Sequence, residues 1–187
     1  VRRVIDVILA AMGTLALAGA LPIVLAVDLV ANRGPLMFSQ PRVGKGGQVF
    51  TMVKFRTLRP GSDDERWTCD GDPRLTRGGA WLRRLHLDEL PNVLSVLRGD
   101  MTLVGPRPEQ PAYVDELTGK LPFYALRHLV RPGLTGWAQV KYGYGGDEVG
   151  ALEKLQYDFY YLHHQGLSLD LRVLGRTVRT VVGGGGR

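Results

Sequence analysis

The sequence predicts an α/β fold of mostly helical character. It would be a small domain with a short β-hairpin, anchored by one N-terminal re-entrant membrane helix and by amphipathic interface helices. Three observations lead to this prediction. Residues 7–27 form a run of 21 residues without a charge. Beyond residue 31, apolar residues recur mostly at helical spacing. One pair of strand-like segments flanks a glycine-rich turn, which is typical of a hairpin. At 187 residues, the chain supports one domain with its own core.

The apolar run allows three interpretations. As one straight helix it would be about 30 Å long, close to the thickness of the hydrocarbon layer of a bilayer. A cleaved signal peptide fits the basic start at Arg2 and Arg3 and the cleavage-like stretch at residues 18–20. However, the residues after that stretch are as apolar as those before it. A spanning helix and a hairpin that re-enters the same membrane face are the other two interpretations.

Pro22 favours the re-entrant hairpin. A proline inside a helix removes a backbone donor and clashes with the preceding turn, so we expect a kink or a break there. The two halves, of about 14 and 10 residues, are each too short to cross a bilayer. Basic residues flank both ends of the run, and the positive-inside tendency then places both ends in the cytoplasm. We therefore predict a membrane hairpin at residues 1–33, a catalytic domain at 34–182 and a flexible tail at 183–187.

The residues after the apolar run predict one hairpin followed by helices. Residues 36–39 and 49–56 are expected strands around the turn Gly44-Lys45-Gly46-Gly47. These glycines imitate a phosphate-binding loop, but no helix pattern follows them, so a hairpin turn is favoured. Residues 59–78 are expected to form a loop.

Residues 79–97 have helical spacing that Pro91 interrupts, which predicts two helices meeting near Asp88. Further along, we expect a short buried strand at 101–104, mostly helix at 111–130 and an extended segment at 135–140. Residues 147–182 predict amphipathic helix suited to a membrane interface, although core packing explains the same residues nearly as well.

Asp88 and Glu89 are the strongest candidates for catalytic residues. Adjacent carboxylates on a helix usually form a solvated face. Here Pro91, which the first turn of a helix tolerates, allows a second helix to begin at or just after Asp88. Asp88 would then lie near a positive helix end, which favours the ionised carboxylate and attracts phosphate. An ionised carboxylate among cations suits nucleophilic attack on phosphorus, with formation of an acyl phosphate.

Basic residues surround this pair in the sequence. Arg83 and Arg84 would approach from the preceding helix. Arg107 lies between two prolines that stiffen its loop, and a rigid guanidinium suits bidentate phosphate binding. A structural turn with an exposed arginine explains Arg107 equally well. Lys54 and Arg56, on an expected strand, add positive charge.

Seven short motifs occur in order along the chain: Lys54-Phe55-Arg56-Thr57, Asp72-Pro73-Arg74, Leu82-Arg83-Arg84, Leu87-Asp88-Glu89-Leu90-Pro91, Gly99-Asp100-Met101, Gly105-Pro106-Arg107-Pro108-Glu109 and Pro132-Gly133-Leu134-Thr135-Gly136-Trp137. Together they resemble the bacterial sugar transferase family, the monotopic polyprenyl-phosphate phosphoglycosyl transferases. The resemblance covers nearly the whole chain. Residues 142–158 resemble the longer members involved in exopolysaccharide synthesis, which carry further transmembrane helices before this domain. The start at Val1 rather than Met fits a piece of such a protein.

The resemblance implies a re-entrant helix and a catalytic face on the cytoplasmic side of the bacterial inner membrane. It also implies that Asp88 attacks the β-phosphate of a UDP-sugar, that UMP leaves, and that undecaprenyl phosphate then takes the sugar phosphate. Glu89 is implied as a ligand of Mg²⁺. The implied phosphate-binding residues are Arg83, Arg107, Lys54 and Arg56.

The net charge of +6 indicates an anionic partner, which composition alone does not identify. With the resemblance, the expected partners are a UDP-sugar, undecaprenyl phosphate and membrane lipid, not nucleic acid; nothing in the sequence indicates an oligomeric state. Two departures from the family pattern are Leu21, where many relatives carry serine before the membrane proline, and Asn92, where glutamine is common.

Two other functions fit parts of the sequence. A glycosyltransferase that moves the sugar alone would release UDP, and Asp70-Gly71-Asp72 imitates the metal-binding motif of such enzymes, but no apolar strand precedes it. A basic, membrane-bound scaffold would show no turnover. His163-His164 could bind a metal, but adjacent histidines on a helix point in different directions. Cys69, the one cysteine, excludes an internal disulfide and has no base nearby in the sequence.

Overall fold

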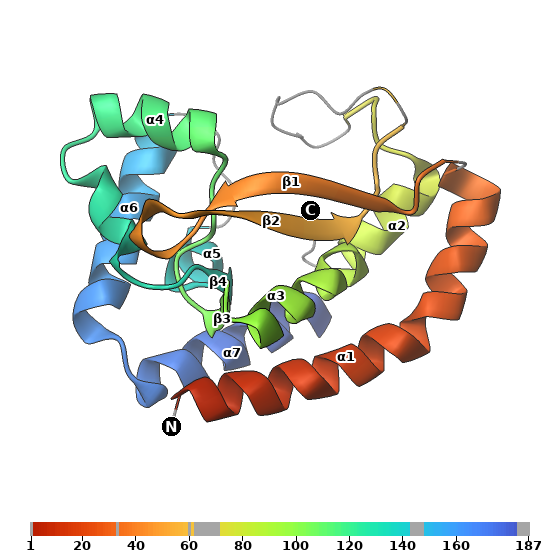
Figure 1. The fold of residues 1–187 in the computed structure, drawn as a ribbon, viewed down its shortest axis with the longest axis horizontal. Coiled ribbons are helices and arrows are strands. Elements are labelled where there is room, and N and C mark those ends of the chain that lie inside the picture. The colour runs from red at the N-terminus through yellow and green to blue at the C-terminus, as the bar shows by residue number, and fades with distance from the viewer. Residues whose placement is uncertain (1, 33, 60, 62–71, 143–147, 183–187) are drawn as a thin grey trace.

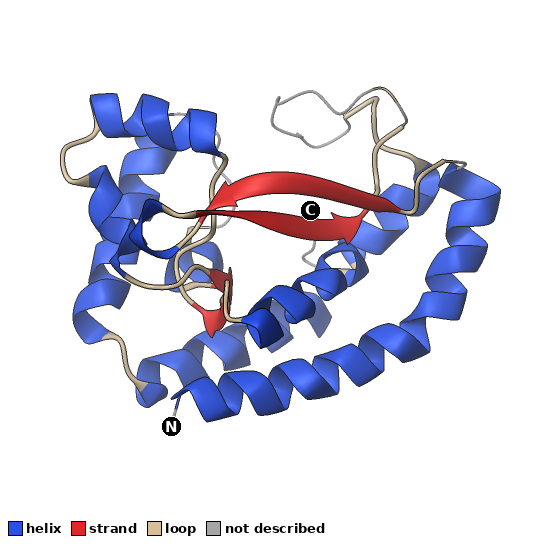
Figure 2. Ribbon diagram, in the orientation of Figure 1, coloured by secondary structure: helices blue, strands red, loops and turns tan. Residues whose placement is uncertain are grey.

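A computed structural model describes residues 2–32, 34–59, 61, 72–142 and 148–182 of the chain. The helices are α1 (Arg2–Val27), α2 (Arg77–Arg84), α3 (Val93–Arg98), α4 (Pro111–Lys120), α5 (Trp137–Lys141), α6 (Glu148–His164) and α7 (Leu167–Val182). Shorter helical turns are η1 (Asp28–Asn32), η2 (Lys45–Gly47), η3 (Leu87–Asn92) and η4 (Tyr124–Leu129). The strands are β1 (Met37–Val43), β2 (Val49–Phe55), β3 (Thr102–Val104) and β4 (Gly133–Thr135). The predicted fold, mostly helical with a short hairpin, is confirmed (Figure 2).

The hairpin forms from β1 and β2, which pair antiparallel with Phe38 opposite Lys54. Their connection is η2, in which Gly46 and Gly47 have φ of 68° and 78°. Glycine adopts this left-handed region without the steric cost that a Cβ imposes. The interpretation of this stretch as a hairpin turn is therefore confirmed, and β1 extends further toward the turn than expected.

A second, smaller sheet joins distant parts of the chain, because β3 and β4 pair in parallel. The expected strand at 101–104 is confirmed, whereas the expected extended segment at 135–140 is wrong. The strand ends at Thr135, and Trp137–Lys141 is helical. Gly133 allows this pairing: a Cβ there would lie 2.1 Å from the backbone nitrogen of Gly105, so any side chain would prevent the two segments from approaching this closely.

The apolar run forms one continuous helix, α1, with Pro22 inside it. Of the kink or break expected at Pro22, the break into two half-helices is therefore wrong. A single proline removes one hydrogen bond of the ladder, which a long helix can survive as a bend. Figure 1 shows α1 following one edge of the molecule and turning toward α2 near its C-terminal end, where η1 continues it as a π-helix.

Three apolar clusters hold the elements together. One lies where α1, α3, β3 and α7 meet, and includes Ala10, Val96, Val104 and Val173. A second joins β1, α4, η4 and α6. The third packs the C-terminal part of α1 on β2 and α2 through Val24, Phe55 and Leu82. The face of α1 that looks away from the domain stays exposed and apolar; its members include Val4, Ile8, Met12, Leu15 and Ile23.

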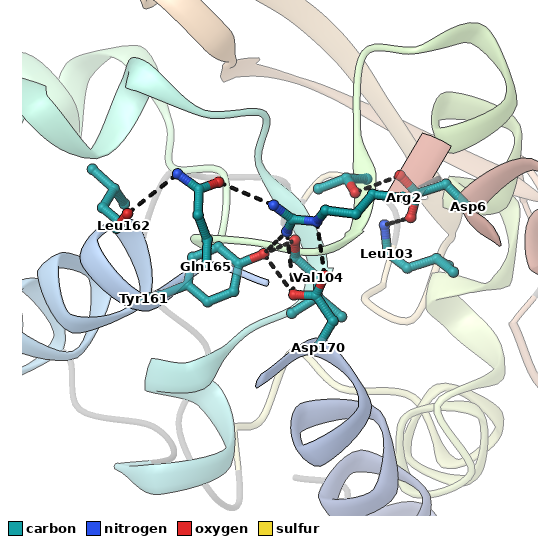
Figure 3. Close-up of polar contacts among 9 residues, drawn as sticks. Arg2, Asp6, Leu103, Val104, Tyr161, Leu162, Gln165 and Asp170 are labelled. Carbon is teal, nitrogen blue, oxygen red and sulfur yellow. Dashed lines mark hydrogen bonds and ion pairs between the residues drawn. The ribbon is translucent and has the colours of Figure 1, made fainter. Parts of the chain in front are cut away.

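Polar contacts tie the N-terminal end of α1 to the rest of the domain (Figure 3). Arg2 pairs with Asp170 of α7 at 2.8 Å and also donates to the hydroxyl of Tyr161, which itself donates to the carbonyl of Val104 at 2.8 Å. Asp6 accepts hydrogen bonds from the hydroxyl of Thr102 at 2.7 Å and from the backbone nitrogen of Leu103 at 3.1 Å.

The C-terminal end of the same helix is held by Arg56. Its guanidinium donates to the backbone carbonyls of Pro35 at 2.6 Å and Leu58 at 2.8 Å, and lies 3.8 Å from the carboxylate of Asp28 in η1. Both ends of α1 are therefore attached to one domain.

Candidate active site

The carboxylate pair lies in a short 3₁₀ turn between two α-helices. α2 ends at Arg84, and His86 then adopts φ of 54°, a left-handed conformation that is uncommon outside glycine. This reversal starts η3, which places Asp88 and Glu89 in its first turn, before α3 continues the chain. The prediction that two helices meet near Asp88 is confirmed.

The β-hairpin covers this turn, since β2 packs on η3. Lys54 of β2 lies on the inner face of the hairpin, with its ammonium 5.4 Å from the ring centroid of Phe38. Burial lowers the pKa of Lys54 to about 8, although the charges of Glu89 and Asp88 act in the opposite direction. Lys54 is therefore a cation that the two carboxylates help to keep charged.

Glu89 is paired with Arg107. The Arg107 guanidinium donates to Oε1 of Glu89 at 2.6 Å. Burial raises the pKa of Glu89, but the charge and the hydrogen bond of Arg107, with help from Lys54 and His86, outweigh burial, so the pKa is lowered. Glu89 is thus held as an anion.

Asp88 behaves differently from its neighbour. It is 7% exposed, and its burial raises its pKa, as does the adjacent charge of Glu89. Lys54 and Arg83 oppose this increase. Arg83 is oriented by a hydrogen bond from its Nε to the hydroxyl of Thr57 at 2.9 Å. The structure therefore brings together Asp88, Glu89, Lys54, Arg83 and Arg107.

Arg56 has a different position. It is 3% exposed, and its hydrogen bonds to Pro35 and Leu58 commit it to the junction between α1 and β2. A role for Arg56 in phosphate binding stays a prediction.

The loop that carries Arg107 is held at four consecutive carbonyls. Those of Pro106 and Glu109 accept hydrogen bonds from the backbone nitrogens of Gly133 and Val43, each at 2.9 Å. The carbonyls of Arg107 and Pro108 accept from the side chains of Arg127 at 2.9 Å and Arg42 at 3.1 Å.

Arg42 and Arg127 are the site residues that sequence reasoning missed. Arg42 lies in β1, and its charge also acts on Lys54. The signal that could have found these two arginines is weak, because neither belongs to the seven motifs that carry the resemblance.

The rival candidates receive little support from their surroundings. His163 and His164 lie at the end of α6 with ring centroids 4.7 Å apart, and His164 stacks on Tyr160. Asp72 forms an ion pair with Arg74 at 2.6 Å. Asp70, Gly71 and Cys69 lie outside the described residues, as does the tail at 183–187. Within the parts of the chain that the structure describes, no three side chains of the metal-ligating types come together.

Fold and site together define a class of protein: a small, mostly helical domain with one long apolar helix and a pair of carboxylates that lies near a lysine and two arginines. By length and composition, α1 and the residues that follow it to position 31 could cross a membrane, and little of this segment is buried in the domain. Such a site suits a substrate that carries phosphate, because guanidinium and ammonium groups are the usual phosphate partners in proteins.

Comparisons with known proteins identify the family. The model of the bacterial sugar transferase family matches residues 1–184. The chain is 43% identical over 189 residues to the UDP-N-acetylgalactosamine-undecaprenyl-phosphate N-acetylgalactosaminephosphotransferase of Aeromonas hydrophila, covering 100% of this chain and 44% of that relative. It is 40% identical over 185 residues to the UDP-glucose:undecaprenyl-phosphate glucose-1-phosphate transferase of Caulobacter vibrioides, covering 97% of this chain and 69% of that relative.

A transferase of the latter name from Escherichia coli K12 is 35% identical over 183 residues, covering 95% of this chain and 39% of the relative. The chain therefore belongs to the bacterial sugar transferase family. It spans less than half the length of the Aeromonas and Escherichia relatives.

Proposed function

We propose that this chain transfers a sugar 1-phosphate from a UDP-sugar to undecaprenyl phosphate and releases UMP, as the first membrane step of exopolysaccharide or glycoconjugate synthesis. The names of the relatives support the two substrates. The observation that carries the proposal is the buried carboxylate Asp88 beside Glu89, with Lys54, Arg83 and Arg107 around them.

The reaction proceeds in two displacements at phosphorus. A carboxylate oxygen of Asp88 attacks the β-phosphorus of the UDP-sugar, the bond to the bridging oxygen breaks, and UMP leaves with that oxygen. The sugar phosphate is then bound to Asp88 as an acyl phosphate. A phosphate oxygen of undecaprenyl phosphate next attacks the same phosphorus, and the Asp88 carboxylate leaves unchanged. Covalent catalysis of this kind divides one difficult step into two easier ones.

The surrounding cations have distinct tasks in these steps. Lys54 and Arg83 counter the effect of burial on Asp88 and so favour its ionised, nucleophilic form. Arg107 lies at the other carboxylate and can bind the diphosphate with the planar fork of its guanidinium. Fixed cations aimed at developing negative charge lower the barrier without reorganising during the reaction.

Glu89 fits the role of a Mg²⁺ ligand in this proposal. Mg²⁺ prefers oxygen ligands and is often held by one or two carboxylates together with substrate phosphates. Glu89 is held as an anion by Arg107. When bound, Mg²⁺ would supply positive charge to the diphosphate. The variant Glu89→Gln should therefore need a higher Mg²⁺ concentration for half-maximal UMP release, and an unchanged Mg²⁺ titration would remove Glu89 from this role.

The proposed location is the cytoplasmic face of the inner membrane, with α1 entering the bilayer and returning. Both ends of α1 are bonded to one domain, through Arg2 and Asp6 at one end and Asp28 at the other. A helix that crossed the bilayer would have to place its ends on opposite sides. Its exposed apolar face, by contrast, suits lipid contact from one side.

The function is tested with purified protein, undecaprenyl phosphate, Mg²⁺ and a panel of UDP-sugars that includes UDP-glucose and UDP-N-acetylgalactosamine. The nucleotide product decides the reaction type. Release of UMP means that the phosphate travelled with the sugar, whereas release of UDP would mean transfer of the sugar alone. No nucleotide release with any UDP-sugar would contradict the proposal.

Asp88→Asn should abolish turnover while the protein stays folded, because an amide is a poor nucleophile toward phosphorus. A loss of several orders of magnitude is typical for removal of a covalent nucleophile. Asp115→Asn is the matched control, since Asp115 is an exposed carboxylate on α4. Intact-mass measurement of the wild type with UDP-sugar alone should reveal one added sugar phosphate, which Asp88→Asn lacks. Near-normal UMP release by Asp88→Asn would refute the assignment.

A further inference from the structure

Arg127 is a buried cation that the proposed reaction does not use directly. It lies in η4 and is 6% exposed. Nη1 donates to the hydroxyl of Tyr124 at 2.6 Å, and Nη2 donates to the main-chain carbonyl of Arg107 at 2.9 Å. Nη2 also lies 2.8 Å from the carboxylate of Asp158 in α6. A buried charge is tolerated when it is paired and hydrogen-bonded in this way.

We propose that Arg127 is a positioning residue: by holding the main-chain carbonyl of Arg107, it sets the place where the Arg107 guanidinium meets Glu89. Asp158 and Tyr124 in turn fix Arg127. The contacts thus form one chain from α6 through η4 and the Arg107 loop to the carboxylate pair. This inference rests on the proposed function, because the position of Arg107 affects rate only if Arg107 binds the transferred phosphate group.

The composition of the loop explains why an outside donor is needed. Pro106 and Pro108 have no backbone N–H, so the segment 106–108 has a single backbone donor of its own, that of Arg107. The loop therefore has to be fixed through its carbonyls. Those of Pro106, Pro108 and Glu109 are held by β4 and β1, and the carbonyl of the functional residue itself is held by Arg127.

Charge is not the means by which Arg127 would act. Asp158, which is 2% exposed, balances the positive charge of Arg127 at 2.8 Å. The pair adds little net field at the carboxylates, so its effect on the site is geometric.

The first test is Arg127→Lys. Lysine keeps the charge that Asp158 requires, but one ammonium group cannot reproduce the guanidinium fork that reaches Tyr124 and the Arg107 carbonyl together. We expect kcat for UMP release to fall on the order of 10- to 100-fold, with a smaller change in KM for the UDP-sugar, because misplacement of a catalytic cation acts mainly on the transition state. In an Arg107→Lys background, Arg127→Lys should reduce kcat by less than about two-fold, because the guanidinium at position 107 that Arg127 positions is already absent.

Two further variants separate positioning from stability. Arg127→Met combined with Asp158→Leu replaces the ion pair by apolar side chains, which is often neutral for stability. It should melt near the wild-type temperature yet show the kcat of Arg127→Lys. Val173→Ala opens a cavity in a different apolar cluster, the one where α1, α3, β3 and α7 meet, so it should lower the melting temperature and leave kcat near the wild-type value.

The outcomes distinguish this inference from the proposed function. If wild-type protein releases no UMP, the proposed function fails. If the wild type is active but Arg127→Lys keeps the wild-type kcat, or if its effect multiplies fully with that of Arg107→Lys, the positioning role is refuted and the proposed function stands. A wild-type kcat in the stable apolar double variant would refute it as well.

Discussion

Two adjacent carboxylates in one turn have opposite electrostatic surroundings. Burial raises the pKa of Asp88, and Glu89 raises it further by like charge. Glu89 has its pKa lowered because Arg107 outweighs the effect of burial. A carboxylate that is paired directly with a guanidinium stays ionised at low cost. A carboxylate that is only near cations, without a direct ion pair, remains more available as a nucleophile. This difference supports separate tasks for the two residues, nucleophile for Asp88 and anionic ligand for Glu89.

Lys54 provides a direct test of these surroundings. Its pKa is lowered to about 8, so the side chain is positively charged below that pH and loses its charge as the pH rises above that value. Exposed lysines titrate near about 10.4. In Mg²⁺-free protein with isotopically methylated lysines, an NMR titration should show one lysine signal that moves near pH 8, and this signal should be missing in Lys54→Arg.

The carboxylate variants then report on the neighbours of Lys54. Glu89→Gln should lower the pKa of Lys54 further, and Asp88→Asn should lower it by a smaller amount, because both anions support the charged form and Glu89 supports it more. Titration of every lysine near its ordinary pKa would contradict the packing of the hairpin on η3.

At the residue scale, sequence reasoning selected two carboxylates and three basic residues that the structure brings together, but not the residues that orient them. Asp88, Glu89, Lys54, Arg83 and Arg107 belong to motifs, so pattern alone could select them. The partner of Arg107 in η4 lies 20 residues further along the chain, and Arg42 reaches the same loop from 66 residues away. Such contacts depend on tertiary packing, which local spacing does not encode.

At the element scale, the first turn of α2 lies directly against Thr57, two residues beyond the end of β2. The hydroxyl of Thr76 caps α2 by accepting from the backbone nitrogen of Gly79 at 2.8 Å, and the same hydroxyl donates to the carbonyl of Thr57 at 3.1 Å. A Cβ on Gly79 would lie 2.0 Å from that carbonyl oxygen. The absence of a side chain at Gly79 therefore allows α2 to approach closely enough for Arg83 to bond to Thr57.

Gly79→Ala should consequently destabilise the protein and weaken the site together. Overpacking against backbone typically costs about 1–3 kcal/mol, and the helix must move away from Thr57 to relieve it. We expect a lower melting temperature and a lower kcat, because Arg83 loses its orientation.

Gly119→Ala is the matched control, since the space around Gly119 in α4 is open. There the change should stabilise the protein by up to about 1 kcal/mol through helix propensity. If thermal melting gave Gly79→Ala the same stability as this control, the close approach of α2 to Thr57 would be contradicted.

Sequence reasoning predicted most helices and strands, but it was wrong where the conformation of one segment depends on packing against a distant segment. Periodicity and turn residues were sufficient for the hairpin, for β3 and for the helices on each side of Asp88. The extended segment expected at 135–140 is instead helical over Trp137–Lys141, because β4 ends where its pairing with β3 ends. A kink or a break was expected at Pro22; α1 is not broken there but continues through the proline and bends along its length. Neither outcome is contained in local propensity.

At the scale of the whole molecule, α1 is a long helix that is attached to the domain at both of its ends. Arg2 and Asp6 hold its N-terminal end to α7 and β3, and Arg56 holds Asp28 at the other. Between these attachments, the outer face of the helix carries exposed apolar side chains. If α1 enters a bilayer as proposed, the domain that holds both its ends must come to the membrane surface with it. The carboxylate pair, whose turn η3 packs on α1, would then lie close to that surface.

The last prediction follows from that geometry and concerns the side of the membrane on which each end of α1 lies. In a Cys69→Ser background, single cysteines introduced as Val1→Cys and Arg33→Cys are probed on intact cells with a membrane-impermeant thiol reagent. If α1 re-enters, neither cysteine is labelled until the membrane is opened. Labelling of position 1 in intact cells would mean that α1 spans the bilayer, and the re-entrant topology would be refuted.

Pro22→Leu tests what maintains this arrangement. Leucine restores the missing backbone donor and relieves the ring clash, so α1 should straighten into a helix long enough to cross the bilayer. Straightening moves the C-terminal end of α1 away from Arg56 and strains the contacts of Arg2 and Asp6 at the other end. We expect part of the Pro22→Leu population to label at position 1 in intact cells, with UMP release falling in proportion. Leu21→Ala, which changes the neighbouring position but keeps the proline, should retain the wild-type labelling pattern. An unchanged pattern in Pro22→Leu would assign the topology to the polar attachments at the two ends of α1 rather than to its bend.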